Sequence, residues 1–392
     1  MPIGRRVAYW RGRRRMSQQV FADRVGKSKS WVDKIERGAR SLNKISTIAD
    51  IAAILRIDPA ILLDRDTQPS DTGERAYGVE RVRAALSTYE MALDRRVPGR
   101  DVLPAAQLAA SVEHAWTTYQ HARYPQLIEG LPDLVVAVQR GYVREPRAMR
   151  VSLVEMYRVT ASLLVKLGET ELAWLAADRA MTIATGDAVL VAAAAVQLGQ
   201  VMRAGRARSA VPIMLAAAYR VAPPDLEGGP AAQLSLCGTL LVQAALAAAQ
   251  HGDEKATARL IDEAVELAAR VGDGHDYHRT GFGPTASAAA RMLVALELGD
   301  TGEALAWHEK TVGSVGWRWL PAEHRAAHLV DAARAHLQAD EPAAAGKLLL
   351  EAAPAEVRYR PVARDVLAQV MRSPDAPSAI IPLAVALQVP VG

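Results

Sequence analysis

Apolar residues recur with the 3.6-residue period of amphipathic helices in five short segments between residues 3 and 65. The first segment carries its apolar side chains at positions 3, 7 and 10, and the others are expected at residues 18–25, 29–37, 45–55 and 59–63. Ser17 and Ser28 stand where helix N-caps belong, and Gly26 and Gly38 stand where helices end. The pattern predicts a compact domain of five helices over residues 1–66.

The polar stretch TQPSDTGERAY, at residues 67–77, has no apolar period and contains both Pro and Gly, which is typical of a linker. Beyond it the chain is rich in Ala and Leu, has few aromatic residues and shows no alternation of β-branched residues, so strands are not expected. We predict an all-α protein with a five-helix domain over residues 1–66, a linker over 67–77 and a second helical domain over 78–392.

The second domain contains a degenerate repeat that becomes visible when its turns are aligned. Spaced 37, 47, 47 and 41 residues apart, the five turn positions are Gly168, Gly205, Gly252, Gly299 and Asp340. This spacing favours helical hairpins stacked into an α-solenoid. The repeat resembles tetratricopeptide repeats, although it is longer than their norm of about 34 residues and lacks most of their aromatic positions. Residues 78–140 are expected to form a connecting bundle or an atypical capping repeat.

In the first domain, a helix, a short turn with Gly and a second helix with a polar start form the pattern that places a recognition helix in the DNA major groove. The segments MSQQVFADRVGKSKSWVDKIERGAR and ILRIDPAILL resemble the phage-repressor and Cro class of helix-turn-helix domains, the XRE family. The Ser-Gln opening, the turn Gly and the Ile-Glu-Arg-Gly exit carry this resemblance. It implies a sequence-specific regulator of transcription, of repressor type, that binds double-stranded DNA as a homodimer.

The resemblance carries DNA contacts over to ten positions of this chain. Gln18 corresponds to the residue that holds a backbone phosphate at a helix N-terminus. Lys29 and Lys34 are candidates for guanine, and Asp33 for a cytosine amino group. Trp31 replaces the small residue usual there and packs either on DNA or on a neighbouring helix. The full set is Gln18, Ser28, Lys29, Ser30, Trp31, Asp33, Lys34, Arg37, Arg40 and Lys44.

The charge distribution agrees with this assignment. Residues 1–66 contain 15 Lys or Arg against 7 Asp or Glu, whereas the rest of the chain carries a net charge of −4. The basic excess is therefore local, as expected where only one domain meets a polyanion. In the same domain, the resemblance predicts a partly buried ion pair between Arg11 and Glu36, and the alternative is two solvated charges.

The least regular part of the second domain is the loop GDGHDYHRTGFGPTAS at residues 272–287. Its Phe-Gly-Pro-Thr segment is similar to one in actinobacterial regulators that join an XRE domain to tetratricopeptide-like repeats. Because solenoids bind partners on their concave face, we predict an effector cavity here. Its expected residues are Tyr277, His278, Arg279, Phe282, Arg291, Trp317, Arg318, Trp319, His324 and His328.

The arginines of that set favour a carboxylate or phosphate on the ligand, and resemblance to peptide-sensing regulators implies a peptide or small metabolite. In the alternative interpretation the loop is a long turn, Pro284 opens a helix and the tryptophans fill the core. His324, His328 and Asp331 share one helix face. A His-x-x-x-His pair can chelate a metal, but solvated or ligand-facing polar side chains are favoured, and no metal site is predicted.

Other classes of function find no support in the sequence. No P-loop, HExxH motif or nucleophile elbow is present, so we do not expect an enzyme. The single cysteine, Cys237, excludes an internal disulfide and a cysteine metal cluster. The N-terminus lacks the apolar core of a secretory signal, and we expect a soluble cytoplasmic protein without cofactors or membrane contact. The alternative function is an interaction scaffold that is recruited to DNA and binds no small ligand.

Overall fold

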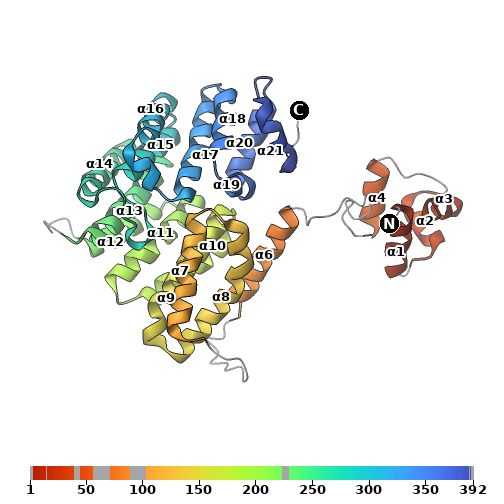
Figure 1. Ribbon diagram of the computed structural model, residues 1–392, viewed down its shortest axis with the longest axis horizontal. Coiled ribbons are helices and arrows are strands. Elements are labelled where there is room, and N and C mark those ends of the chain that lie inside the picture. The colour runs from red at the N-terminus through yellow and green to blue at the C-terminus, as the bar shows by residue number, and fades with distance from the viewer. Residues whose placement is uncertain are drawn as a thin grey trace. The chain divides into compact units, whose positions relative to one another are not determined.

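The computed structural model describes residues 3–14, 16–38, 45–55, 71–88, 103–222, 229–387 and 389. Within these residues every regular element is an α-helix or a 3₁₀-helix and no strand occurs, which confirms the predicted all-α class. The chain divides into two compact units, Met1–Glu74 and Arg75–Gly392. We call them the N-terminal unit and the body (Figure 1).

The N-terminal unit begins with four helices that coincide with the first four predicted segments. They are α1 (Ile3–Arg13), α2 (Gln18–Val25), α3 (Lys29–Glu36) and α4 (Ile45–Leu55). The fifth predicted segment, at residues 59–63, lies outside the described residues. The Ser17 hydroxyl accepts a hydrogen bond of 3.2 Å from the backbone N–H of Val20, as an N-cap should. Gly26 ends α2 with a φ of 68°, in the left-handed region that favours glycine.

The core of this unit forms where the apolar faces of the four helices meet. It comprises Val7, Phe21, Ala22, Val32, Ile35, Ile48, Ile51, Ala52 and Leu55. Helices α1 and α3 approach closely at Gly4, where an added Cβ atom would lie 1.8 Å from the carbonyl oxygen of Ile35. Because no side chain fits at this crossing, glycine allows α1 to support the buried side of α3.

The linker predicted over residues 67–77 is only partly described. Residues 67–70 lie outside the described part of the chain, and the remainder forms the first turns of helix α6 (Asp71–Leu86). This stretch is helical because it packs against the body, which its polar composition does not indicate. Arg75 donates hydrogen bonds to the carbonyl of Leu167 and to Glu169, and a Cβ atom at Gly78 would meet the side chain of Ile128. Helix α6 is therefore anchored on the body from Arg75 onward.

The body is built from helix pairs, each joined by a short turn (Figure 1). The pairs are α7 (Ala105–Gln120) with α8 (Tyr124–Arg144), α9 (Pro146–Lys166) with α10 (Thr170–Ala184), α11 (Ala188–Ala204) with α12 (Ala210–Val221), α13 (Ala231–Ala249) with α14 (Glu254–Val271), α15 (Pro284–Leu298) with α16 (Thr301–Val312), and α17 (Ala322–Gln338) with α18 (Pro342–Glu351). The remaining elements are α19 (Pro354–Tyr359), α20 (Pro361–Met371), α21 (Ile381–Ala386) and the 3₁₀-helices η1 (Tyr277–Arg279), η2 (Val315–Trp319) and η3 (Ser378–Ile380).

Each of the five predicted turn positions lies between the two helices of a pair. Gly168, Gly252 and Gly299 adopt φ values of 76°, 73° and 84°, in the left-handed region, and Asp340 adopts a φ of 60°. Gly205 follows α11 with a φ of −83°, so this turn makes no use of the freedom of glycine. The body therefore has the helical hairpin arrangement that the sequence predicts.

Helix α13 is the one helix in the described residues that is long and apolar enough to cross a membrane. Within the body, 78% of that stretch is buried, because α13 packs against α11, α12, α14 and α15. Its apolar surface is therefore used in the protein core.

The series of helix pairs curves until its last helices meet its first ones. Helix α17 contacts α7, and α19 contacts α8, although these helices are far apart in the sequence. At the turn after α9, an added Cβ atom at Gly168 would lie 2.8 Å from the ring of Pro361. The body is thus a solenoid closed into a ring, with the first helices of the pairs on its inner side.

Candidate DNA-binding surface and body cavity

Arg11 and Glu36 hold three helices of the N-terminal unit together. Arg11 Nε donates to Glu36 Oε1 at 2.6 Å, and its Nη2 donates to Oε2 at 3.0 Å. Gln18 Nε2, from the start of α2, donates to the same Oε2 at 2.8 Å. The hydrogen bond to Glu36 holds the pKa of Arg11 above its ordinary value, although partial burial opposes the charge. Arg11 and Glu36 therefore form an ion pair in the structure. Gln18, the first residue of α2, is hydrogen-bonded to the same carboxylate.

Helix α3 is capped at its start and presents polar side chains to solvent. The Ser28 hydroxyl accepts a hydrogen bond of 3.1 Å from the backbone N–H of Trp31. Lys29, Ser30 and Lys34 are exposed. Helical spacing places Ser30 and Lys34 opposite the buried Val32 and Ile35, whereas Lys29 lies at the exposed start of the helix. An exposed helix of this kind fits a major groove about 12 Å wide.

Two other predicted contact residues are engaged within the unit. Trp31 is partly buried and packs against the core of the N-terminal unit. Asp33 forms an ion pair with Arg37, one turn later on the helix. Contact between Asp33 and a cytosine would require that pair to open. Arg40 and Lys44 lie outside the described residues.

A cavity of about 550 Å³ lies on the inner side of the ring. Its lining comes from the first helices of the six pairs, from residues 279–282 and from residues 360–362. The apolar part of the lining includes Trp116, Tyr119, Phe282, Met292, Leu293 and Leu320, and the polar part includes Gln197, Gln200, Arg203, Thr239 and Gln243. The volume falls within the range of about 300 to 1,000 Å³ that small-molecule sites occupy.

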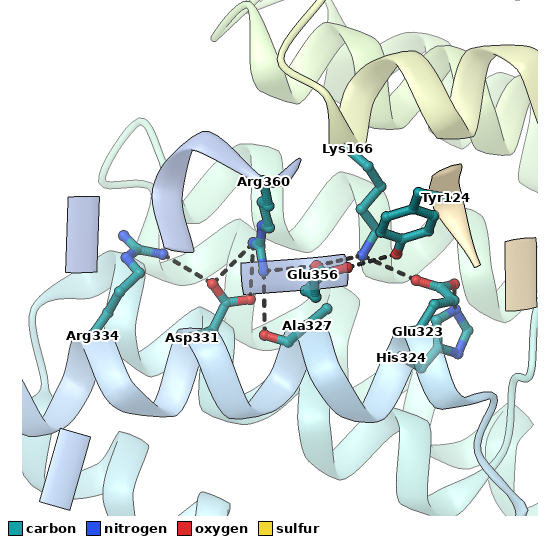
Figure 2. Close-up of polar contacts among 9 residues, drawn as sticks. All are labelled: Tyr124, Lys166, Glu323, His324, Ala327, Asp331, Arg334, Glu356 and Arg360. Atoms are coloured by element: carbon teal, nitrogen blue, oxygen red, sulfur yellow. Dashed lines mark hydrogen bonds and ion pairs between the residues drawn. The ribbon is translucent and has the colours of Figure 1, made fainter. Parts of the chain in front are cut away.

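A cluster of charged side chains lies at one side of this cavity, and Figure 2 shows the contacts among them. Lys166 Nζ lies 3.0 Å from Glu323 Oε2 and 2.9 Å from Glu356 Oε1. Burial alone would raise the pKa of Glu323, but attraction to Lys166 and His324 outweighs burial and holds that pKa at about 2. Burial would likewise lower the pKa of Lys166, yet the two carboxylates keep it above its ordinary value. Glu323 and Lys166 are therefore both charged at neutral pH.

The cluster continues along α17. Arg360 Nη2 lies 3.0 Å from Asp331 Oδ1, and its Nη1 lies 3.5 Å from Glu356 Oε1. Arg334 Nη1 lies 3.4 Å from Asp331 Oδ1 (Figure 2). Burial opposes the charge of Asp331, but the two arginines outweigh it and lower the pKa of that carboxyl. Each buried carboxylate of the cluster therefore has a cationic partner, which a charge in a low-dielectric interior requires.

Four of the ten predicted effector residues line the cavity, namely Arg279, Phe282, His324 and His328. Phe282 is buried against α13, where an added Cβ atom at Gly238 would lie 2.0 Å from its ring. His324 Nε2 lies 3.0 Å from Glu323 Oε1. The structure thus brings residues of the loop and of α17 to the wall of one cavity.

The other six residues of that set lie elsewhere. Tyr277 stacks on His275, and the carbonyl of His278 accepts a hydrogen bond of 2.8 Å from Arg158. Trp317 lines a second cavity of about 380 Å³, between α16, α17 and α18. Trp319 is exposed and does not fill the core.

The arginines expected to attract an anion are already engaged with other side chains. Arg291 Nη2 lies 2.6 Å from Asp262 Oδ1, and the same guanidinium lies over the ring of Trp307. Arg279 forms an ion pair with Glu113. Arg318 stacks on Trp319, 5.0 Å from the ring centroid. The expected positive charge of the site therefore does not come from these three residues.

A histidine pair lies where the two cavities approach each other. His308 Nδ1 and His328 Nε2 are 2.9 Å apart, so one ring donates to the other. Burial, together with the neighbouring His308, lowers the pKa of His328 to about 4 and keeps its ring neutral at physiological pH. Across the described residues, no group of three or more His, Cys, Asp or Glu side chains is placed to hold a metal ion.

Sequence reasoning missed the residues that set the electrostatics of the cavity, among them Lys166, Arg203 and Glu356. In the sequence, such residues can be found as single charged residues within an apolar helix. A charged residue is rarely buried without a partner, so its presence there indicates a buried polar contact. Arg158 is an example, since its side chain is fully buried and its Nε donates to Gln197 Oε1 at 2.8 Å. The partner itself lies on another helix and is not evident from the local pattern.

Comparison with known families identifies one part of the chain. A family model described as a helix-turn-helix domain matches residues 2–63, the segment that contains α1 to α4. No match was found among the curated proteins or among the solved structures. The N-terminal unit therefore contains a helix-turn-helix DNA-binding domain, and α2 and α3 lie within the matched segment.

Proposed function

We propose that this protein is a cytoplasmic transcriptional regulator of the XRE type, which reads a two-fold DNA operator as a homodimer and senses an effector through its body. The observation that carries the proposal is the exposed polar face of α3, with Lys29, Ser30 and Lys34, in a domain that matches the helix-turn-helix model. Lysines on such a helix pair with guanine edges, and a basic domain is attracted to the phosphate backbone.

The architecture of the body supports the sensory role. A tetratricopeptide-like solenoid closed into a ring has an inner cavity, and a ligand that fits this cavity in one conformation of the ring favours that conformation. A change of ring curvature in each subunit would alter the spacing of the two recognition helices on DNA. The cavity volume of about 550 Å³ agrees with an effector of small-molecule size.

Selection of DNA from a randomised duplex library by the full-length protein, followed by footprinting, tests this function. We expect a two-fold site whose half-sites are about 10 bp apart, or a multiple of that spacing. The affinity should fall steeply between about 50 and 200 mM salt, because lysines and arginines release counterions from the phosphates. A single asymmetric footprint, or binding indifferent to salt, would contradict the proposal.

A further inference from the structure

The acidic side chains that line the ring cavity already have cationic partners. Glu297, Glu323 and Asp331 lie 3.8, 3.0 and 3.0 Å from nitrogen atoms of Arg334, Lys166 and Arg360, respectively. A cationic ligand would therefore have to displace an existing ion pair to reach a carboxylate. This arrangement disfavours cations as occupants of the cavity.

Arg203, on α11, differs from the other cations of the lining. Its Nε donates to Gln243 Oε1 at 2.7 Å, which fixes the plane of the guanidinium. Within the described residues, no hydrogen bond or ion pair engages its Nη1 and Nη2 groups. Burial lowers the pKa of Arg203, although Glu297 and Asp331 are near enough to attract it. Arg203 is thus an oriented, partly buried cation whose outer N–H groups have no acceptor among the described residues.

Other polar groups also line the cavity. Gln197, Gln200 and Arg203 follow one another at three-residue spacing and form a polar stripe along the cavity side of α11. Two further lining residues carry buried nitrogen atoms without a partner in the described part of the chain, namely Trp116 Nε1 and His328 Nδ1. Buried polar atoms without hydrogen-bond partners are costly, so a ligand that satisfies them gains affinity.

The remaining lining is apolar and aromatic. Trp116 and Phe282 are almost fully buried, and Met292 and Leu293 extend this surface along α15. Such a wall accommodates a hydrophobic group of a ligand rather than a fully hydrated ion. Because Lys166 ties α9 to α17 and α19, the cavity lies inside a closed ring of helices and does not continue as the long concave groove that an extended peptide occupies.

From these observations we propose that the ring cavity binds a small organic anion, with a carboxylate or phosphate group on Arg203 and an apolar group against Trp116 and Phe282. The two outer nitrogen atoms of the guanidinium match two oxygen atoms of either group. The proposal rests on the sensory role of the body given above and names the chemical class of its effector.

The test uses the full-length protein and three probes of similar size, namely phenylbutyrate, phenyl phosphate and the neutral amide phenylbutyramide. Binding is measured by titration calorimetry and by the shift of the thermal midpoint. At least one of the two anions should bind about tenfold or more tightly than the amide, because a charge-assisted pair forms only with the anion. Whichever of the two anions binds more tightly shows whether the site prefers a carboxylate or a phosphate.

Two variants and one control locate the site. Arg203→Met should remove the preference for the anion, whereas Arg291→Met, which changes an arginine paired with Asp262 outside the cavity, should keep it. Ala289→Trp places an indole in the cavity and should weaken binding of all three probes while leaving Arg203 in place. Circular dichroism identifies any variant that fails to fold. If one of Arg203→Met and Ala289→Trp does not fold, the other still tests whether the ligand binds in this cavity.

The proposal is overturned if neither anion binds more tightly than the amide at concentrations up to about 5 mM, or if Arg203→Met binds the anion as well as the unchanged protein. Operator binding is measured on the same samples, so the two proposals can fail separately. A protein that binds its operator and no anion loses only the ligand class proposed here. A protein that binds the anion and no operator retains this site and loses the regulatory function.

Discussion

The hydroxyl of Tyr124 donates a hydrogen bond of 2.6 Å to Glu356, a residue 232 positions later in the chain. Lys166 lies 2.9 Å from the other oxygen of the same carboxylate. Through this one buried side chain, α19 is bonded to both α8 and α9. The closure of the ring therefore depends on specific polar contacts as well as on apolar packing, and these contacts can be removed one at a time.

Lys166→Met should destabilise the body strongly. The substitution removes the cation that lies between Glu323 and Glu356, and both carboxylates stay buried with only their weaker partners. Breaking a buried pair in this way costs about 3 to 5 kcal/mol, whereas Arg291→Met breaks an exposed pair with an expected cost of about 0 to 1 kcal/mol. Urea unfolding of the full-length variants measures both values. Similar losses for the two variants would show that the cluster does not hold the ring closed.

His328 makes the stability of the body depend on pH. Its pKa is about 4 in the folded protein because of burial and of His308, compared with about 6.5 in an unfolded chain. Between these values the unfolded state binds more protons, so stability is fully present above pH 6.5 and declines as the pH falls toward 4. His328→Gln should remove up to about 3 kcal/mol of this decline. Thermal melts of both proteins across this pH window provide the comparison.

His324, also on α17, changes the pH dependence of stability in the opposite direction from His328. Burial disfavours the charge of His324, but Glu323 outweighs burial and raises the pKa of His324. Its contribution is therefore present at low pH and is lost as the pH rises through its folded pKa. Around His328, the groups that titrate or carry charge are His308 on α16 and Asp331 on α17. If His328→Gln leaves the pH profile unchanged, one of these other groups controls it.

The elements that could be predicted from sequence are those set by local patterns. The turns at Gly168, Gly252 and Gly299 combine a residue that tolerates positive φ with the end of one apolar period and the start of the next. In the N-terminal unit, Ser17 and Ser28 are the N-caps of α2 and α3, and they mark the starts of these helices in the sequence. Such signals need no knowledge of distant residues.

The parts that escaped prediction depend on distant contacts. Closure of the ring joins Tyr124 to Glu356, and no periodicity encodes that pairing. The same limit applies to the cavity. Arg291 was expected on the inner face, but on α15 the cavity is lined by other residues, among them Ala289, Met292 and Leu293. A charged residue in a helical repeat does not show by itself which face of the helix it occupies.

The contacts of Arg11 and Glu36 predict strong coupling in a double-mutant cycle. Arg11→Met should leave Glu36 buried with only Gln18 as a partner, and Glu36→Gln should leave Arg11 partly buried without a counter-charge. Each single change should cost more than the 0 to about 1 kcal/mol of an exposed pair, and the double variant should cost less than the sum of the two. Hydrogen exchange of α1 to α3 in the full-length protein measures the local stability. Additive losses would show that the two side chains do not stabilise each other.

Lys34→Ala should change the base preference of the protein. Lys34 is exposed on α3, so its loss should cost about 1 to 3 kcal/mol at the selected operator and relax the preference at one base pair. Lys255→Ala, at an exposed lysine on α14 in the body, serves as the control and should change neither property. Competition between the operator and its single-base variants measures both effects. A uniform loss of affinity for every sequence would assign Lys34 to a phosphate instead of a base.

The two glycines of α1 provide the sharpest comparison in the N-terminal unit. An added Cβ atom at Gly4 would lie 1.8 Å from the carbonyl oxygen of Ile35, whereas Gly12 has nothing within 4 Å of such an atom. Gly4→Ala should therefore push α1 away from α3, destabilise the unit by about 1 to 3 kcal/mol and weaken operator binding, because α3 loses its support.

Gly12→Ala fills open space and should stabilise the same helix by up to about 1 kcal/mol, because alanine has the higher helix propensity. Hydrogen exchange of α1 and α3, together with operator titration, compares the two variants in the full-length protein. Equal effects of the two substitutions would mean that the crossing of α1 and α3 has room for a methyl group. The support of the recognition helix would then rest on Arg11, Gln18 and Glu36 instead of on close backbone packing.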